Sequence, residues 1–404
     1  MSTSILYHGW QVRGYEYLRS EFVGGRLEMH IRRRRPEIAC PTCGRRDVLL
    51  RGTVERPLRT LPIGGKTVIL KVAVQRVWCR HCHAVRQVKL RIADPYRSYT
   101  KAFERYALDL CRSMTILDVA HHLGISWDVI KDIQKRRLKA KFGRPRLKDV
   151  RLLAIDEIAI AKGHRYVTVV LNWETGRVLF VGDGKGADAL TPFWAMLGRR
   201  RRRIRAVAID LSPAYVEAVT KNLPDATIVF DHFHVVKLFN EKLSDLRRDV
   251  QNEAETTQKK QVLKGTRWLL LKNPEHLDSR RNERQRLEEA LRLNQPLATA
   301  YYLKEDLRQI WNQPDRATAE RLLDDWVKRA EASGIQMLKK FAKTLAAHRS
   351  GILAYYHYPI STGPLEGTNN KIKTMKRQAY GFRDLEFFKL KILGIHETKY
   401  ALVG

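Results

Sequence analysis

Two Cys-x-x-Cys pairs constrain the N-terminal part of this 404-residue chain more tightly than any other feature. Cys40 and Cys43 form the first pair, and Cys79 and Cys82 form the second. The segment between the pairs alternates apolar and polar residues, as the strands of a hairpin do. Four thiolates suit the tetrahedral coordination of zinc, so the pattern predicts a zinc ribbon with a structural zinc ion. Two disulfides are the alternative, which a reducing cytoplasm disfavours.

The fifth cysteine and two nearby histidines are not needed for this site. Cys111 is expected to be a buried thiol. His81 and His83 lie in or beside the second pair and could replace a ligand, but four cysteines already complete the set.

The chain is strongly basic, with 76 Lys and Arg against 43 Asp and Glu and a net charge of +33. More than half of this excess lies in residues 1–150. Basic charge at this density favours a polyanion through counterion release, which predicts a nucleic-acid partner. No apolar run approaches the ~18 residues of a membrane span, and the N-terminus does not resemble a signal peptide. We therefore expect no membrane partner and a cytoplasmic, nucleoid-associated location.

Residues 115–141 have the spacing of a helix-turn-helix. Ala120 allows two helices to approach, Gly124 permits the turn, and Ser126 can cap the second helix. An ordinary helical hairpin is the alternative, but basic segments on both sides favour DNA binding. The residues expected to contact DNA are Ser126, Trp127, Lys131, Gln134, Lys135, Arg136, Arg137 and Arg144.

The next part of the chain predicts strands and helices in the order β-β-β-α-β-α-β, which is RNase H-like. The expected strands are 150–156, 165–173, 177–183, 204–210 and 226–231, and the expected helices are 188–199 and 213–222. The first and fourth strands end in Asp156 and Asp210. Two carboxylates side by side repel unless a cation lies between them, and magnesium prefers oxygen ligands. Glu157 would face the opposite side of its strand and is the second choice for metal binding.

Residues from about 235 to 356 are charged and Leu-rich at helical spacing, which predicts an all-helical insertion. Trp268, Trp311 and Trp326 are expected to pack in its core, with a role beside DNA as the secondary interpretation. After the insertion, Pro364 and Gly363 lead into a polar helix. Residues that are three or four positions apart lie on one face of a helix, so one set of polar side chains should share a face here. This set is Glu366, Asn369, Asn370, Lys373 and Arg377.

The order of the zinc knuckles, the helix-turn-helix and the motifs IDE, IDLSPAY, DHFHVVK and GPLEGTNNKIK resembles bacterial insertion-sequence transposases of the ISL3 group. These have an RNase H-like core with a DDE triad, and the resemblance covers nearly the whole chain. It implies that Asp156, Asp210 and Glu366 are catalytic and hold two magnesium ions, for which manganese may substitute. Asp231 and His234 resemble the Asp-x-x-His pairing of several DDE groups, although a structural hydrogen bond is an equal alternative. Possible active-site support is thus assigned to Asp231, His234, Asn369, Asn370 and Lys373.

The resemblance implies a transposase that binds the terminal inverted repeats of its element and then cleaves and joins double-stranded DNA. Two ends must be processed together, so a homodimer or larger synaptic complex with element ends and target DNA is expected. Two alternatives remain: a zinc-containing transcriptional regulator with an inactive RNase H-like domain, and a structure-specific nuclease without strand transfer.

The expected fold is a multi-domain α/β protein. Its predicted parts are a basic zinc ribbon (1–98), a helix-turn-helix with a basic linker (99–149), the first part of an RNase H-like core (150–235), an all-helical insertion (236–356) and the C-terminal part of the core with the Glu-bearing helix (357–404).

Overall fold

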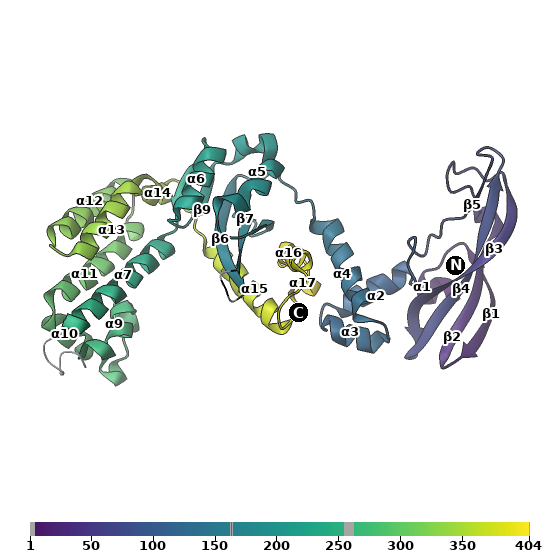
Figure 1. Ribbon diagram of the computed structural model, residues 1–404, viewed down its shortest axis with the longest axis horizontal. Helices are drawn as coiled ribbons and strands as arrows, with labels where there is room; N and C mark the ends of the chain where they lie inside the picture. The colour runs from purple at the N-terminus through teal and green to yellow at the C-terminus, as the bar shows by residue number, and fades with distance from the viewer. Residues whose placement is uncertain (1–4, 162, 164, 254–261, 404) are drawn as a thin grey trace. The chain divides into compact units, whose positions relative to one another are not determined.

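The computed structural model describes residues 5–161, 163, 165–253 and 262–403 (Figure 1). The chain divides into two compact units. The first unit comprises Met1–Gly143 and Thr374–Gly404, and the second comprises Arg144–Lys373. Among the described residues, no helix is long and apolar enough to cross a membrane.

A five-stranded sheet forms the N-terminal part of the first unit. After α1 (Ile5–Trp10), its strands are β1 (Tyr15–Val23), β2 (Arg26–Arg33), β3 (Val48–Ile63), β4 (Lys66–Cys79) and β5 (Ala84–Gln87). The order is β1-β2-β4-β3, with β5 also paired to β4. β3 and β4 form the long hairpin that the alternating pattern predicts, closed by Gly64 and Gly65 at positive φ. The inward residues of β4, such as Leu70 and Val72, are fully buried.

Three helices follow the sheet: α2 (Lys101–Leu110), α3 (Ile116–Leu123) and α4 (Trp127–Phe142). Thr115 caps α3 by accepting a hydrogen bond from the Asp118 N–H, and Gly124 ends it at a φ of 60°. The left-handed conformation of Gly124 produces the sharp turn into α4, which confirms the predicted helix-turn-helix. Ser126 occupies the cap position of α4, but its side chain makes no capping hydrogen bond, so that detail of the prediction is wrong.

The C-terminal helices α16 (Leu385–Leu393) and α17 (Lys399–Leu402) also belong to the first unit. Phe387, Leu390 and Ala401 share a core with the residues of α2, α3 and α4. The predicted assignment of all of 357–404 to the catalytic core therefore differs from the packing. The reason is that the apolar side chains of α16 and α17 are buried against the helix-turn-helix.

The second unit contains the predicted β-β-β-α-β-α-β order. Its strands are β6 (Leu152–Ala161), β7 (Arg165–Asn172), β8 (Val178–Asp183), β9 (Ala206–Ile209) and β10 (Thr227–Phe230). The sheet order is β10-β9-β6-β7-β8, with β6, β7 and β8 antiparallel and β9 and β10 parallel to β6. The connecting helices are α5 (Thr191–Leu197), flanked by short 3-10 turns, and α6 (Pro213–Asn222). Helix α5 is thus shorter than the predicted 188–199.

Close packing between β8 and the turn that follows it gives a test of this fold. A Cβ added to Gly182 would lie 2.2 Å from the backbone oxygen of Ala189. We expect Gly182→Ala to lower the free energy of unfolding by ~1–3 kcal/mol or more, because backbone must move to relieve the clash. The matched control is Gly186→Ala, where nothing lies within 4 Å of the added carbon. Urea unfolding of the two variants checks this, and equal stabilities would contradict the packing.

Helices after β10 form the predicted insertion, seen beside the sheet in Figure 1. They are α7 (His232–Glu253), α9 (Arg267–Leu271), α10 (Glu283–Leu293), α11 (Gln295–Gln309), α12 (Arg316–Ala332), α13 (Gln336–Ala347) and α14 (Arg349–Leu353), and α15 (Gly363–Gln378) follows. Trp326 is fully buried, and its indole N–H donates to the Leu303 carbonyl at 2.7 Å. Trp311 is also buried. The packing prediction is wrong for Trp268, which is 66% exposed.

Candidate active site and zinc site

The sheet of the second unit places two of the predicted carboxylates side by side. β6 and β9 are parallel neighbours, with Ala154 opposite Ala208. Continuing this register by two residues brings Asp156 opposite Asp210, which directly follows β9. Buried apolar residues precede each carboxylate. The predicted end of the first strand at Asp156 is wrong, because β6 continues to Ala161 while it pairs with β7.

The third carboxylate, Glu366, lies in the first turn of α15. The start of this helix is held from two sides. Asp231, 3% exposed, accepts hydrogen bonds from the backbone N–H of Thr362 at 3.1 Å and from its hydroxyl. The Trp173 indole donates to the Ser361 carbonyl at 3.0 Å. Because Asp231 directly follows β10, this contact fixes α15 against the sheet, which favours the structural interpretation of that residue.

A cavity of about 540 Å³ lies where these elements meet. All of the predicted catalytic and supporting residues line it, although they come from distant parts of the sequence. They are Asp156, Asp210, Asp231, His234, Glu366, Asn369, Asn370 and Lys373. The fold therefore brings together the whole set that the motifs indicate.

Asp156 is the best-defined carboxylate in the cavity. Its two oxygens accept hydrogen bonds at 2.8 Å, one from the Asn369 side-chain amide and one from the Glu157 backbone N–H. Burial raises the pKa of Asp156, nearby His234 opposes that shift, and Asp210 adds to it through like-charge repulsion. The other amide atom of Asn369, its Oδ1, is buried without a hydrogen-bond partner in the described structure.

Glu157 also lines the cavity, contrary to the expectation that it faces away. Burial raises the pKa of Glu157, and repulsion from the Asp210 carboxylate raises it further. Adjacent residues of a strand point to opposite faces of the sheet. Because β9 ends at Ile209, however, β6 has no neighbouring strand on that side next to Glu157 in the described structure. The side chains of both Asp156 and Glu157 therefore reach the cavity. One oxygen of Glu157 is buried without a partner. The sequence assigned no role to Tyr215 of the IDLSPAY motif, which is fully buried, shares a 3.0 Å hydrogen bond with the Thr168 hydroxyl and lowers the pKa of Glu157 in part.

The carboxylates share one cavity but do not converge as closely as metal ligands. Among the described residues, the four predicted zinc ligands are the only group of three or more His, Cys, Asp or Glu whose ligand atoms all lie within 4.8 Å of one another.

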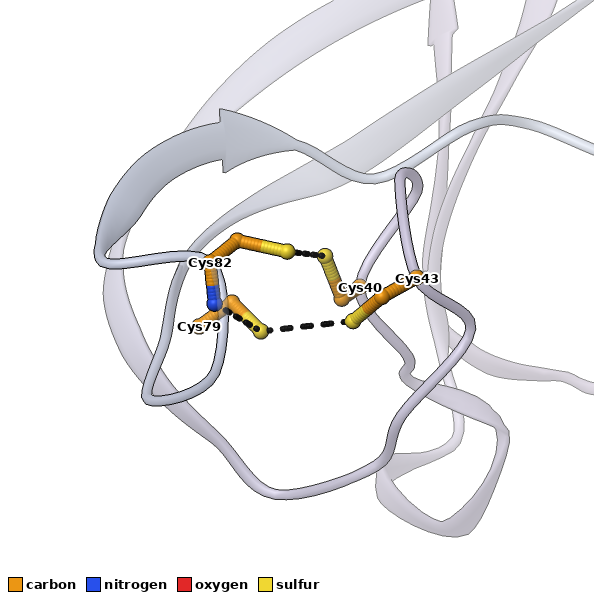
Figure 2. Close-up of side chains that lie close together, drawn as sticks. All are labelled: Cys40, Cys43, Cys79 and Cys82. Atoms are coloured by element: carbon orange, nitrogen blue, oxygen red, sulfur yellow. Dashed lines mark hydrogen bonds between the residues drawn. The ribbon is translucent and has the colours of Figure 1, made fainter.

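The four cysteines lie at the end of the hairpin of the first unit (Figure 2). The Sγ atoms of Cys40 and Cys82 are 3.9 Å apart, and those of Cys43 and Cys79 are 3.6 Å apart. Zn–S bonds of ~2.3 Å in a tetrahedron put sulfur atoms ~3.8 Å apart, so the donor set fits zinc, whereas a disulfide needs ~2 Å. Backbone N–H groups of Cys43 and Thr42 lower the pKa of Cys40, whereas the neighbouring thiols, Cys43 first, raise the pKa of Cys82. Four thiols this close do not all ionise without a cation, which bound zinc would supply.

The helix-turn-helix places the predicted DNA-contacting residues in different environments. Ser126, Trp127, Arg137 and Arg144 are exposed. Gln134 is 1% exposed, so its expected position on the outer face is wrong. Burial raises the pKa of the neighbouring Cys111 thiol, and Gln134 lowers it in part. The helical periodicity that places Lys131 and Lys135 outward turns Gln134 toward the core of α2, α3 and α4.

Lysines of α4 are paired with the acidic start of α16. Lys131 and Lys135 lie 3.1 and 3.0 Å from one carboxylate oxygen of Asp384, and Lys135 lies 2.8 Å from Glu386. Arg136 pairs with Asp132 and Glu104. DNA contact through these three cations would therefore need existing ion pairs to break or be shared.

Comparisons with known proteins agree with this architecture. Residues 36–82 match the zinc finger of transposases IS204, IS1001, IS1096 and IS1165, residues 88–138 match the helix-turn-helix domain of transposase family ISL3, and residues 153–392 match the ISL3 transposase domain. The ribbon, the DNA-binding helices and the core with its carboxylate-lined cavity thus define a DNA transposase, an enzyme that cuts and joins DNA. The chain belongs to the ISL3 transposase family.

Two relatives show the extent of the similarity. The transposase for insertion sequence element IS1001 of Bordetella parapertussis is 36% identical over 388 residues, covering 95% of each chain. The transposase for IS1557 of Mycobacterium tuberculosis is 30% identical over 369 residues, covering 85% of this chain and 82% of that protein. The Drosophila P element transposase strand transfer complex aligns with a TM-score of 0.41 at 12% identity, over 74% of this chain and 92% of that one.

Proposed function

We propose that this transposase binds the terminal inverted repeats of its own insertion sequence and cleaves and joins DNA in a metal-dependent reaction. Asp156, Asp210 and Glu366 are the proposed catalytic carboxylates. The observation that supports this most directly is the single cavity that all three line, two from the edge of the sheet and one from α15.

The residues of the cavity fit magnesium. Carboxylates are the hard oxygen ligands that this ion prefers, and the unpartnered oxygens of Glu157 and Asn369 are further acceptors without a donor. Two magnesium or manganese ions, when bound, supply activation of the attacking oxygen and stabilisation of the leaving oxygen. Asp156, Asp210 and Glu366 would hold them, with Glu157 as the reserve ligand.

The other residues of the cavity position the reacting groups. Asn369 orients the Asp156 carboxylate through its amide N–H, and Asp231 holds the start of α15 so that Glu366 faces the sheet. Lys373 and Asn370, on the same helix, are placed to bind the phosphates that flank the scissile bond. Water as the nucleophile releases a 3′ hydroxyl, and attack by that hydroxyl on a target phosphate joins the strands.

End recognition is assigned to the zinc ribbon and the helix-turn-helix, because these carry most of the excess positive charge. The exposed residues Trp127, Arg137 and Arg144 are the proposed contacts of the second helix and the linker. Two ends must be cut in one event, so we propose that the active assembly is a dimer or larger synaptic complex.

The test is a joining assay with linear DNA that carries the element's ends and a supercoiled target, with and without added magnesium. Wild-type protein should give joined products in magnesium alone, and Glu366→Gln should abolish them. Glu217→Gln is the matched control, since Glu217 is an exposed carboxylate on α6, outside the cavity. Cleavage without joining would indicate a nuclease, and DNA binding without either would indicate a regulator.

A further inference from the structure

The helical insertion presents one tryptophan to solvent. Trp268 lies in the short helix α9, whose other face buries Leu269 and Leu270. The indole is 66% exposed, and the guanidinium of Arg267 lies 4.9 Å from its ring centroid. Single exposed apolar side chains are common on protein surfaces, so this ring indicates a binding site only together with the charges beside it.

Other cations lie along the segment that leads into this ring. Arg286 donates to the Gly265 carbonyl at 3.3 Å, and the buried Arg247 donates to the Leu263 carbonyl at 3.1 Å. Burial lowers the pKa of Arg247, and the positive charges of Arg267 and Arg248 lower it further. The Trp268 surface consists of the exposed residues Arg248, Lys264, Arg267, Trp268 and Arg286.

These cations are weakly neutralised by the protein itself. Arg248 pairs with Asp245 within α7, but Arg267 and Arg286 form no ion pair with an acidic residue in the described part of the chain. The Gly265 carbonyl positions the Arg286 guanidinium without cancelling its charge. Like charges held together in this way repel, and a polyanion relieves the repulsion.

We propose that the Trp268 surface binds DNA at an unpaired nucleotide, with the indole stacked on the exposed base and the arginines on the neighbouring phosphates. Stacking needs a base that is free of its duplex, whereas the arginines need only the backbone. An acidic protein would satisfy the arginines but would leave the indole face unused. This inference rests on the proposed function, because unpaired nucleotides arise beside the ends that a transposase cleaves.

The test measures binding with no magnesium or manganese added, so that no cleavage occurs and the zinc stays bound, with the full chain and fluorescent DNA of unrelated sequence. One probe is a blunt duplex, and the other is the same duplex with a short unpaired overhang. Wild-type protein should prefer the overhang. Trp268→Ala should lose that preference by about tenfold or more, and Trp268→Phe should keep most of it. Tyr302→Ala is the matched control, since Tyr302 is also an exposed aromatic residue of the insertion, at 61%.

Contact is checked directly with 5-iodouracil in the overhang, which should photo-crosslink to the peptide that contains Trp268. An unchanged overhang preference in Trp268→Ala would overturn the proposal. So would an equal loss of affinity for both probes, or competition by poly-glutamate as effective as by single-stranded DNA of equal charge. A failed joining assay would contradict the proposed function but would leave this binding result unaffected, since no chemistry is involved.

Discussion

Asp156→Asn is expected to reduce DNA cleavage and joining by ~1000-fold or more while sparing the binding of DNA ends. The substitution removes one charge from the set that would hold the metal ions, and loss of such a group removes stabilisation made chiefly in the transition state. The replacement is nearly isosteric. Its amide oxygen can still accept the 2.8 Å hydrogen bond from the Asn369 amide, so the position of α15 should be kept.

A stability measurement separates this chemical effect from unfolding. Burial raises the pKa of Asp156, which means that the metal-free fold disfavours its charged form. Asp156→Asn should therefore melt, with no magnesium added, at a temperature equal to or above that of the wild type. It should also gain less thermal stability than the wild type when magnesium is added, because the ion has lost a ligand. Magnesium-dependent cleavage at the wild-type rate in this variant would exclude Asp156 from the catalytic set.

The sequence predicts the sheet of the second unit well because its strands are short apolar runs with clear turns between them. One apolar run leads to Asp156 and another to Asp210, and pairing the two runs as neighbouring strands brings the carboxylates side by side, although β6 itself continues past Asp156. The position of Glu366 cannot be predicted from a local pattern in the same way, because only the packing of α15 brings this residue to the cavity. The contact between Asp231 and Thr362 supplies that packing, and no local pattern predicts it.

Other features depend on packing that periodicity does not contain. Strand alternation places Glu157 on the far face, but the early end of β9 opens the cavity to it. Helical spacing cannot tell whether a tryptophan lies on the inner or outer side of a short helix, so Trp268 and Trp326 look alike in sequence. The same limit applies to α16, whose burial against the helix-turn-helix arises from contacts between residues more than 240 positions apart, such as Lys135 with Asp384.

Removal of zinc should unfold one end of the ribbon. Beside the cysteines, the small core consists of Ile38, Val77 and Val88, with Val48 packed against it. Three buried aliphatic side chains do not offset the conformational entropy of two knuckles, whereas zinc bound to four thiolates contributes on the order of 10 kcal/mol in small zinc domains. The opposite end of the sheet has its own larger core around Trp10 and should stay folded.

Cys79→Ser, or a strong chelator, should therefore release the zinc ion and expose the knuckles to trypsin, with rapid cleavage after Arg46 and Arg80. Cys79 is chosen for this substitution because its side chain is 1% exposed and its backbone pairs with Val48 in the hairpin. Cys111→Ala is the matched control: it removes a thiol from the core of the helix-turn-helix and should leave one zinc ion per chain, as native mass spectrometry would show. Full zinc content or wild-type protease resistance in Cys79→Ser would contradict the assigned ligand set.

Because the knuckles belong to the basic end of the chain, the same substitution should weaken binding to element ends and leave the cavity of the second unit intact.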